Sequence, residues 1–585
     1  MAWSRAARPT ALLVVLLAVP LATSDYFAYE LGLYLLYGIA AQGVGLAWGR
    51  AGFLPLGQAL FFGLGAYLTG FVLKGAAVHG SWVLVLLLVA VALPTALAYL
   101  IGRLVFARSH ANGPDFPLIT LALTMLGYQI ANQWTSVTGG FNGLTGIPQL
   151  PGLDRYGVGF YDLVAVVCVL STAGVAWLQR TPLGTLWSAT AQNEDRLQFF
   201  GFPTDRLKSV AFAVSAFLAA VAGLLYAPQQ GLVTPLSVGF ELSAGFLIWA
   251  AVGGRASPYG ALLGAVFIGL LSMELRNRFT YWEVVIALIF IVVVLRFPVG
   301  IIGGVERAWS WLFPGHGRLT ATRPVAAPGS RLATTSVPRL AYEAVEVVKG
   351  GVRILDGLRM TVDQPGIHCI IGPNGAGKTS SFNVLTGRLP LTSGRIRLSG
   401  RDVSRARADV MARLGVGRKF QIPSVFGGLS VTDNIRIGLW ANRIGGMDLL
   451  RGAPQAWSTP LLLRLQRAFP FLEDSQQRRA GTLSQGQRQM LEFAMTALAE
   501  PNLLLLDEPC AGLSPDETQH LSSVIADVVR SLGATALMIE HDMAAVEALA
   551  DDVFVLHQGS LMAAGSYAEI RSNRDVQAIY AGGRK

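Results

Sequence analysis

The chain has 585 residues and a formal net charge of +10, and its composition is 52% hydrophobic and only 14% charged. Its length leaves room for two or more domains, and its basic residues form no single run, so the charge does not indicate a nucleic-acid-binding surface. The cysteines Cys168, Cys369 and Cys510 have no CxxC or Cys/His spacing, which argues against a disulfide framework or a zinc site, and we expect each to fill a small apolar space.

Charged residues are distributed unevenly along the chain. The first 302 residues contain 15 Lys/Arg and 11 Asp/Glu, whereas the remaining 283 contain 31 and 25. Few charges among long apolar runs are typical of a membrane protein, and the second part has the charge of a soluble domain. We therefore predict a transmembrane domain over 1–302, a linker over 303–339 and a soluble domain over 340–585.

The first 302 residues contain apolar stretches long enough to cross a membrane. A helix needs roughly 20 mostly apolar residues to do so, because lipid offers the backbone no hydrogen-bonding partner. One further stretch, 241–272, is interrupted by GGRASPYG and is predicted as two short helices. The uninterrupted stretches lie at about 10–28, 30–47, 53–73, 81–106, 116–134, 160–178, 209–231 and 281–302.

Basic residues near the ends of these stretches predict their orientation, because Lys and Arg concentrate in short cytoplasmic loops. They fall on one side of the membrane before the first crossing and after two, four and six crossings. This predicts a cytoplasmic N-terminus and eight to ten spans. The part after residue 302 lies on the same side if 241–272 makes no net crossing. The residues are Arg5, Arg8, Arg50, Arg103, Arg108, Arg180, Arg196, Arg206 and Lys208.

Two features of the apolar part have two interpretations each. The opening RAARPTALLVVLLAVPLATS fits a cleaved signal peptide or an uncleaved first span, and we prefer the span because the topology uses it. The side chains of Gln58, Gln129 and Asn132 fit a solute path and equally fit hydrogen bonds between helices. No loop on the outer side exceeds about 25 residues, so we expect no ligand-capturing domain there.

The segment RTPLGTLWSATAQNEDRLQFFGFPTDRLKS, residues 180–209, is the longest polar interruption of the apolar part. Residues 190–200 are predicted to form a short helix, ended by a glycine, that docks on a soluble partner. A solvated loop is the alternative. Residues 303–339 are rich in Pro, Gly, Ser and Thr without apolar periodicity, which predicts a linker.

The stretch IHCIIGPNGAGKTSSFNVLTG places a GxxxxGKT motif between a predicted buried strand, 367–371, and a helix that begins at about Lys378. Its glycines permit a tight loop whose backbone N–H groups converge on phosphate oxygens beside the positive end of the helix. Lys378 is placed to reach the β- and γ-phosphates and Thr379 to bind Mg²⁺. The predicted ATP-binding residues are Gly372, Pro373, Asn374, Gly375, Ala376, Gly377, Lys378, Thr379 and Ser380.

The four leucines of NLLLLDEP predict a strand covered on both faces of a parallel sheet. Such a strand delivers Asp507 to a magnesium ion at its C-terminal end. Glu508 follows in position to act as general base for the attacking water. TALMIEHDM predicts a second buried strand, which ends near His541 and places this side chain to contact the γ-phosphate.

In this order the motifs resemble those of the ATP-binding-cassette (ABC) ATPases, over residues 340–583. The resemblance implies an α/β P-loop fold with a helical subdomain. It also assigns Gln421 of FQIPSVF to the Q-loop and LSQGQ, 483–487, to the signature. It implies catalytic roles for Glu508, His541 and Gln421, and metal binding by Thr379, Gln421 and Asp507.

In that family two cassettes face each other head to tail, and the signature of one grips the γ-phosphate held by the other. Ser484, Gly486 and Gln487 would therefore act in trans on the nucleotide of a second cassette. The resemblance leaves open whether the second permease and ATPase form a homodimer or a heterodimer with this chain.

Three positions depart from the family pattern. Gln485 replaces the usual first glycine of the signature, a change found in several importer subfamilies. Lys349 stands where an aromatic residue normally stacks on adenine, and Tyr342 is only a weak substitute. Ser514 stands where many members have an aspartate, so communication between the two ATP sites is expected to differ.

Segments of the first 302 residues resemble the permeases of branched-chain amino acid importers. They are GVGLAWGRAGFLPLGQALFFGLGAYLTG (43–70), LITLALTMLGYQIANQWTSVTGGFNGL (118–144), residues 183–201 and AAVGGRASPYGALLGA (250–265). The family implies a cytoplasmic coupling helix, here about 190–201, that inserts into the Q-loop cleft of the cassette. It also implies a separate extracytoplasmic substrate-binding protein.

The sequence is thus interpreted as a polytopic α-helical membrane domain of eight to ten spans followed by a cytoplasmic α/β P-loop (ABC) ATPase domain. It predicts half of an ATP-driven importer, embedded in the lipid of a bacterial inner membrane, for branched-chain amino acids or a related small polar or amide solute. An ATPase-gated channel or regulator is the alternative class. Urea, short amides and small aromatic acids are alternative solutes.

Overall fold

The computed structural model describes residues 2–75, 80–107, 115–276, 278–297, 299–304, 325–330, 332, 339–451 and 456–582. The chain forms two compact units. The helical unit comprises Met1–Ala191, Asp205–Thr320 and Leu450–Ala453, and the sheet unit comprises Gln192–Thr204, Ala321–Leu449 and Pro454–Lys585. Residues 192–204 precede the predicted domain boundary at 302, yet they belong to the compact body of the sheet unit.

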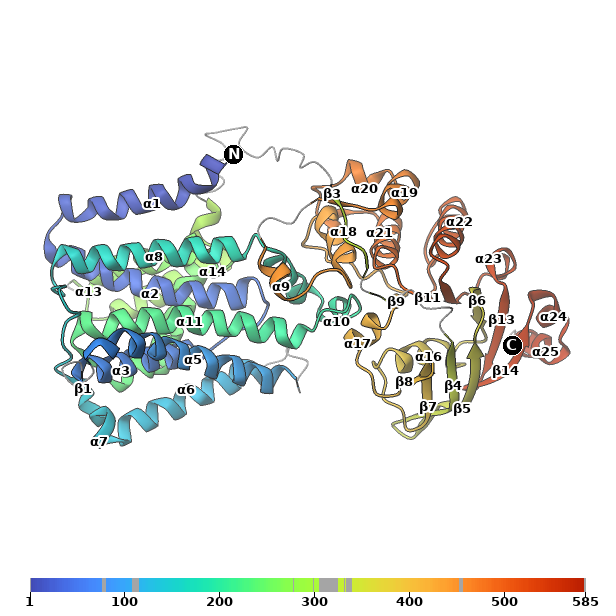
Figure 1. Ribbon diagram of the computed structural model, residues 1–585, viewed down its shortest axis with the longest axis horizontal. Helices are drawn as coiled ribbons and strands as arrows, with labels where there is room; N and C mark the ends of the chain where they lie inside the picture. Colours follow the sequence, from blue (N-terminus) through green and yellow to red (C-terminus); the bar gives the residue numbers. More distant parts are fainter. Residues whose placement is uncertain are drawn as a thin grey trace. The chain divides into compact units, whose positions relative to one another are not determined.

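Long apolar helices form the helical unit (Figure 1, blue to green). Five of the helices in the described residues, α2, α5, α8, α11 and α13, are long and apolar enough to cross a membrane. Shorter apolar helices are Pro9–Ala22 within α1, then α3, α12, and Trp282–Val293 within α14. The bounds are α1 (Ala2–Ala22), α2 (Asp25–Gly49), α3 (Gln58–Lys74), α5 (Val83–Phe106), α6 (Asp115–Gln133), α7 (Thr135–Thr138), α8 (Val158–Leu178), α9 (Pro182–Gln192), α11 (Thr204–Gln230), α12 (Phe240–Gly253), α13 (Pro258–Arg276) and α14 (Trp282–Arg296), with β1 (Leu144–Thr145) paired to β2 (Leu232–Val233).

Each predicted apolar stretch contains a helix, but some ends differ from the prediction. The predicted boundary between the first two stretches, at 28–30, is wrong. The chain breaks at 23–24 because the Ser24 hydroxyl accepts a hydrogen bond from the N–H of Phe27 and caps α2. The stretch 241–272 forms two helices, α12 and α13, as predicted. Arg108, used above for orientation, lies outside the described residues.

Small and polar side chains join the helices of the helical unit. Gly223 of α11 lies against the backbone of Phe62 in α3, where a Cβ would collide with the carbonyl oxygen. Close approach at glycine is the usual basis of helix packing in lipid. Gln58 adds hydrogen bonds from its Nε2 to the carbonyl oxygens of Ala40 (3.1 Å) and Ser215 (2.9 Å). These contacts favour the helix-to-helix interpretation of Gln58.

Two sheets form the centre of the sheet unit (Figure 1). The first has the strand order β14-β13-β6-β12-β11-β9 and is parallel except for the β13/β14 pair. The second, of order β5-β4-β7-β8, is antiparallel. The bounds are β4 (Leu340–Lys349), β5 (Val352–Val362), β6 (Gly366–Ile371), β7 (Ser393–Leu398), β8 (Arg401–Asp402), β9 (Val416–Lys419), β11 (Leu503–Asp507), β12 (Thr535–Ile539), β13 (Asp552–His557) and β14 (Ser560–Gly565).

The strands predicted to be covered on both faces are completely buried. Every residue of β11 and of β12 is buried, because the apolar runs LLLL and TALMI lie in the middle of the parallel sheet. One hydrophobic core joins both sheets to the helix after β6, and its fully buried members include Val345, Leu355, Ile370, Phe382 and Leu505. This core holds the carboxyl ends of the parallel strands in fixed positions.

Helices complete the sheet unit. They are α10 (Glu194–Gln198), α16 (Lys378–Leu385), α17 (Ala408–Arg413), α18 (Val431–Trp440), α19 (Pro460–Ala468), α20 (Phe471–Asp474), α21 (Gln485–Leu498), α22 (Pro515–Leu532), α23 (Met543–Leu549), α24 (Tyr567–Ser572) and α25 (Arg574–Gly582). Of the predicted linker, Val325–Ala326 (β3) pairs in parallel with Trp457–Ser458 (β10), so this piece is a strand. Most of the rest of 303–339 lies outside the described residues.

Candidate functional site

The phosphate loop, residues 372–379, connects β6 to α16, and both elements lie where the sequence predicts them. Gly375 and Gly377 have φ angles of 82° and 98°, in the left-handed region that favours glycine. A Cβ at Gly375 would meet no atom within 4 Å, whereas one at Gly377 would lie 2.8 Å from Leu355 Cδ2 of β5. The loop therefore packs tightly against the sheet on one side and has open space on the other, which suits a bound phosphate.

Lys378 lies folded along this loop. Its Nζ donates hydrogen bonds to the carbonyl oxygens of Gly372 (2.7 Å) and Pro373 (3.0 Å). Burial lowers the pKa of this ammonium group, and the carboxylates of Glu508 and Asp507 oppose the shift. The loop thus combines backbone N–H donors with a cation, which is the chemistry that binds phosphate.

Asp507 ends β11 next to the start of α16, with 1% of its surface exposed. Thr379 Oγ1 donates to Asp507 Oδ1 at 3.3 Å, and Arg418 Nη2 lies 3.6 Å from Oδ2. Burial raises the pKa of Asp507, whereas Arg418 and the Thr379 hydrogen bond favour its charged form. A hydroxyl and a carboxylate are therefore held side by side at the phosphate loop.

Glu508 brings two other predicted site residues together. Gln421 Nε2 donates to Glu508 Oε2 at 2.8 Å, and His541 Nε2 lies 2.9 Å from Oε1. Glu508 has a φ of 44°, a conformation that costs a non-glycine residue roughly 1–3 kcal/mol and occurs preferentially at functional positions. Three segments far apart in the sequence thus converge on one carboxylate.

Arg418, in β9, is a residue of this region that the sequence analysis missed. Its guanidinium is almost completely buried and donates to Asn383 Oδ1 (2.8 Å) and Thr386 Oγ1 (2.7 Å) at the end of α16, beside its contact with Asp507. Burial lowers the pKa of Arg418 to about 10, and Asp507 opposes this shift. The sequence did offer a signal for this residue: two adjacent basic residues, Arg418 and Lys419, end a short strand just before the Q-loop.

The signature forms the start of α21. Ser484 Oγ accepts from the N–H of Gln487 at 3.1 Å, and Gln487 Oε1 accepts from the N–H of Ser484 at 3.2 Å, which is a capping box. Gly486 is buried, and Ser484 is exposed. A Cβ at Gly512 would lie 2.7 Å from Gln485 Nε2, so the glutamine that departs from the family pattern reaches the loop after Asp507 and Glu508.

The two other departures have different structural settings. Ser514 caps α22, and its hydroxyl accepts from the N–H of Glu517 at 3.3 Å. Tyr342 is 2% exposed, and its hydroxyl donates to the carbonyl oxygen of Ser381 at 3.1 Å. Tyr342 is therefore unable to stack on adenine even as a weak substitute, because its ring is part of the core. Lys349 is exposed at the end of β4, where the chain turns into β5.

The docking segment, defined as residues 192–204, packs within the sheet unit. The single helix predicted over 190–200 is wrong. The chain forms α9 up to Gln192 and the separate α10 from Glu194, because the Asn193 side chain accepts from the N–H of Arg196 at 2.9 Å and begins a new helix. The docking element therefore lies at the predicted place in the sequence, but the chain there forms the end of one helix and a separate short helix.

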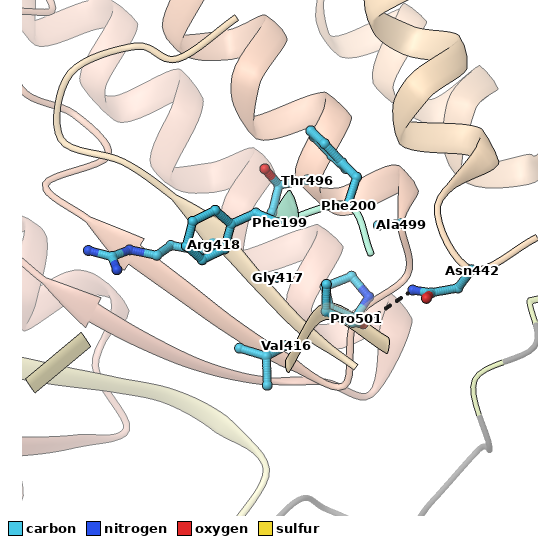
Figure 2. Close-up of a pocket in the computed structure, with 10 residues that line it drawn as sticks. Phe199, Phe200, Val416, Gly417, Arg418, Asn442, Thr496, Ala499 and Pro501 are labelled. Atoms are coloured by element: carbon cyan, nitrogen blue, oxygen red, sulfur yellow. Dashed lines mark hydrogen bonds between the residues drawn. The ribbon is translucent and has the colours of Figure 1, made fainter. Parts of the chain in front are cut away.

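Contacts anchor the docking segment beside the Q-loop. Asn193 Nδ2 donates to Ser424 Oγ at 3.0 Å, and Gln192 Oε1 accepts from the N–H of Gly428 at 2.6 Å. Figure 2 shows Phe199 and Phe200 of the segment, which line a pocket together with residues of β9 and of the C-terminal end of α21. The residues lining this pocket are Phe199, Phe200, Ala412, Val416, Gly417, Arg418, Asn442, Thr496, Ala499 and Pro501. The solvated-loop alternative for this segment is therefore not supported.

Metal binding requires oxygen ligands at the phosphate loop. Among the residues that the structure describes, no group of three or more His, Cys, Asp or Glu side chains could hold a metal ion. Mg²⁺ in nucleotide sites usually takes one or two protein oxygens and completes its shell with phosphates and water. The neighbouring Thr379 hydroxyl and Asp507 carboxylate fit that requirement.

Comparisons with known proteins cover both units. Residues 26–295 match a family model described as the permease component of branched-chain amino acid transport systems, and residues 355–511 match the ABC transporter model. The high-affinity branched-chain amino acid transport ATP-binding protein BraF of Pseudomonas aeruginosa is 36% identical over 257 residues. The match covers 42% of this chain and 99% of BraF.

Further relatives cover a similar share of the chain. The protein LivG of Escherichia coli K12, which has the same description, is 33% identical over 260 residues, covering 42% of this chain and 99% of LivG. A solved structure of an ATP-binding cassette of an ABC transporter in its ADP conformation is 27% identical, with a TM-score of 0.36. It covers 42% of this chain and 99% of that chain.

Proposed function

Because this chain belongs to the ABC transporters of the branched-chain amino acid transport family, with permease and ATPase domains in one polypeptide, we propose that it is half of an importer for branched-chain amino acids. The ATPase domain binds ATP and couples its hydrolysis to transport, and the permease domain is embedded in a membrane with several spans. We assign it to a bacterial inner membrane, with the ATPase domain in the cytoplasm.

The convergence of Gln421 and His541 on Glu508 is the observation that carries the proposed mechanism. Glu508 acts as general base and accepts a proton from the water that attacks the γ-phosphate. Gln421 and His541 orient this carboxylate, and His541 also contacts the γ-phosphate. The phosphate loop and Lys378 hold the β- and γ-phosphates and stabilise the charge that develops on them.

Thr379 and Asp507 would hold Mg²⁺ together with the nucleotide, and Gln421 would complete the protein ligands when ATP is present. The ion supplies positive charge to the phosphate oxygens. Arg418 and the Thr379 hydroxyl favour the charged form of Asp507 that this role requires, and oppose the increase in its pKa caused by burial. Removal of Mg²⁺ with a chelator is expected to stop hydrolysis.

The working unit contains two cassettes. Ser484, Gly486 and Gln487 grip the γ-phosphate of a second ATPase, which belongs to another copy of this chain or to a related one. The exposed Ser484 at the start of α21 supports this role. Closure of the two cassettes is transmitted to the permease through the docking segment.

Branched-chain amino acids are the proposed solute, since the family model of the permease domain and the curated relatives of the ATPase domain carry this description. A separate extracytoplasmic binding protein delivers the solute, as in an importer of this type. Urea, short amides and small aromatic acids are competing solutes. Uptake of labelled leucine into vesicles containing the chain and its binding protein, with these solutes as competitors, tests the choice.

The variant Glu508→Gln tests the catalytic assignment. It removes the proton acceptor but keeps the side-chain size, so ATP binding is retained and turnover falls by roughly a hundredfold or more. Steady-state hydrolysis and binding of labelled ATP by the full chain in lipid nanodiscs measure the two effects. The partly exposed Glu343, which pairs with Arg397 on the antiparallel sheet, provides the control Glu343→Gln. Hydrolysis by Glu508→Gln at the rate of this control would contradict the assignment.

A further inference from the structure

The docking segment buries a charged side chain inside the sheet unit. Arg196, on α10, is 1% exposed, and its Nη1 donates to the carbonyl oxygen of Arg418 at 2.5 Å. Its Nη2 donates to Thr496 Oγ1 at 2.9 Å. Nη1 also lies 3.5 Å from the Oε1 of Glu492, which is completely buried. Since an unpaired charge is costly at such depth, Arg196 and Glu492 depend on each other.

Glu492 connects this ion pair to the Q-loop. Its Oε1 also accepts a hydrogen bond at 3.2 Å from the backbone N–H of Phe420, the residue before Gln421. The Arg196 guanidinium lies over the Phe420 ring, 5.6 Å from its centroid. Gln421 in turn donates to Glu508. One continuous set of contacts therefore leads from the docking segment to the acidic residue at the ATP site.

We propose that Arg196 is a positioning residue for ATP hydrolysis. Through Glu492 and Phe420 it holds Gln421 against Glu508, so the sheet unit hydrolyses ATP at full rate only while the docking segment is seated. This inference rests on the proposed function, in which Glu508 is the general base. It adds a specific pair, Arg196 and Glu492, through which the seated segment controls the chemistry.

A purely structural ion pair would give a different result when both charges are removed. Each single variant, Arg196→Met or Glu492→Leu, leaves one buried charge without its partner, so both the unfolding temperature and kcat should fall. The double variant removes both members of the pair, so its unfolding temperature should lie above those of the two single variants. The N–H of Phe420 still lacks its acceptor, however, so kcat of the double variant should stay roughly tenfold to a hundredfold low.

A second comparison, between two variants of Glu492, tests its contact with Phe420 and does not require the double variant to regain stability. Glu492→Gln keeps an oxygen that accepts from the Phe420 N–H, whereas Glu492→Leu has none. The glutamine variant should retain a kcat close to wild type, and KM for ATP should be unchanged in both. Equal kcat values for the two Glu492 variants would overturn the proposal.

The experiment uses the full chain in lipid nanodiscs and measures basal kcat, KM for ATP and the unfolding temperature. Arg413→Met is the matched control, because Arg413 also bonds the docking segment, at the carbonyl oxygen of Gly201 (2.9 Å), but its side chain is 46% exposed and lies off the path. A wild-type kcat for Arg196→Met or for the double variant overturns the proposal. Normal hydrolysis by Glu508→Gln would instead overturn the assignment of the general base, which keeps the two failures distinguishable.

Discussion

The helical unit and the sheet unit both bury polar side chains, but of different kinds. The helical unit buries mainly amides and hydroxyls, and the buried charges among its described residues, Asp205 and Lys208, lie close in sequence at the start of α11. The sheet unit buries charged groups close to its ATP site, among them Arg196, Lys378, Arg418, Lys419, Glu492, Asp507 and Glu540. Substitutions in the helical unit should therefore change assembly of the helices, whereas substitutions of these buried charges should change catalysis as well as stability.

The largest effect is expected from removal of a buried charge at the ATP site. Arg418→Met leaves Asp507 without its ion-pair partner and removes the hydrogen bonds to Asn383 and Thr386. We expect a loss of about 3–5 kcal/mol in the free energy of unfolding, together with a large loss of kcat. Chemical denaturation and steady-state hydrolysis measure the two quantities.

The exposed Arg353, paired with Asp356 on β5, is the matched control for that experiment. Arg353→Met should change the free energy of unfolding by no more than about 1 kcal/mol, because exposed ion pairs contribute little. If the Arg418 and Arg353 variants had equal stability and activity, the distinction between buried and surface charges in the sheet unit would fail.

In the helical unit the largest effect is expected at a close helix contact. Gly223→Val places a side chain against the Phe62 carbonyl, so α3 and α11 must separate, at a cost of about 1–3 kcal/mol. Gly174 of α8 provides the control Gly174→Val, because a Cβ there meets no atom within 4 Å. Thermal unfolding of the detergent-solubilised chain should show a lower midpoint only for the Gly223 variant.

Substitution of Gln58 distinguishes a structural role of this side chain in the helical unit from a role in solute transport. Gln58→Leu removes its hydrogen bonds to Ala40 and Ser215, so the free energy of unfolding should fall by about 1–2 kcal/mol. The exposed Gln129 on α6 is the control, and Gln129→Leu should leave stability unchanged. Altered solute uptake by Gln58→Leu at unchanged stability would instead favour the solute-path interpretation.

The smallest expected effect is a gain at the surface of the sheet unit. Lys349→Tyr introduces an aromatic ring where the family pattern has one, and stacking on adenine should lower KM for ATP about twofold to tenfold without changing kcat. Lys349→Leu tests whether apolar surface alone suffices. An unchanged KM for the tyrosine variant would show that the base of ATP is not bound at the end of β4.

The motifs of the sheet unit could be located from the sequence because each depends on local chain geometry. The phosphate loop is specified by glycines that permit left-handed backbone, and the LLLL and TALMI runs identify buried strands by their composition alone. Apolar stretches likewise predict the helices of the helical unit, although the cap at Ser24 moved the first boundary.

The contacts between these elements could not be predicted from the sequence and are seen only in the tertiary structure. Glu492 is an acidic residue in a helix and Arg196 a basic residue in a polar loop, and nothing in their local sequence pairs positions 296 residues apart. The local sequence pattern also did not predict the burial of Tyr342, which depends on its packing partners, or the helix break at Asn193, which depends on a side-chain cap. By itself the sequence determined the chemical groups of the ATP site and the elements that carry them. Only the folded chain decided which buried charges meet, because a charge is stable in the interior only where another element supplies its partner.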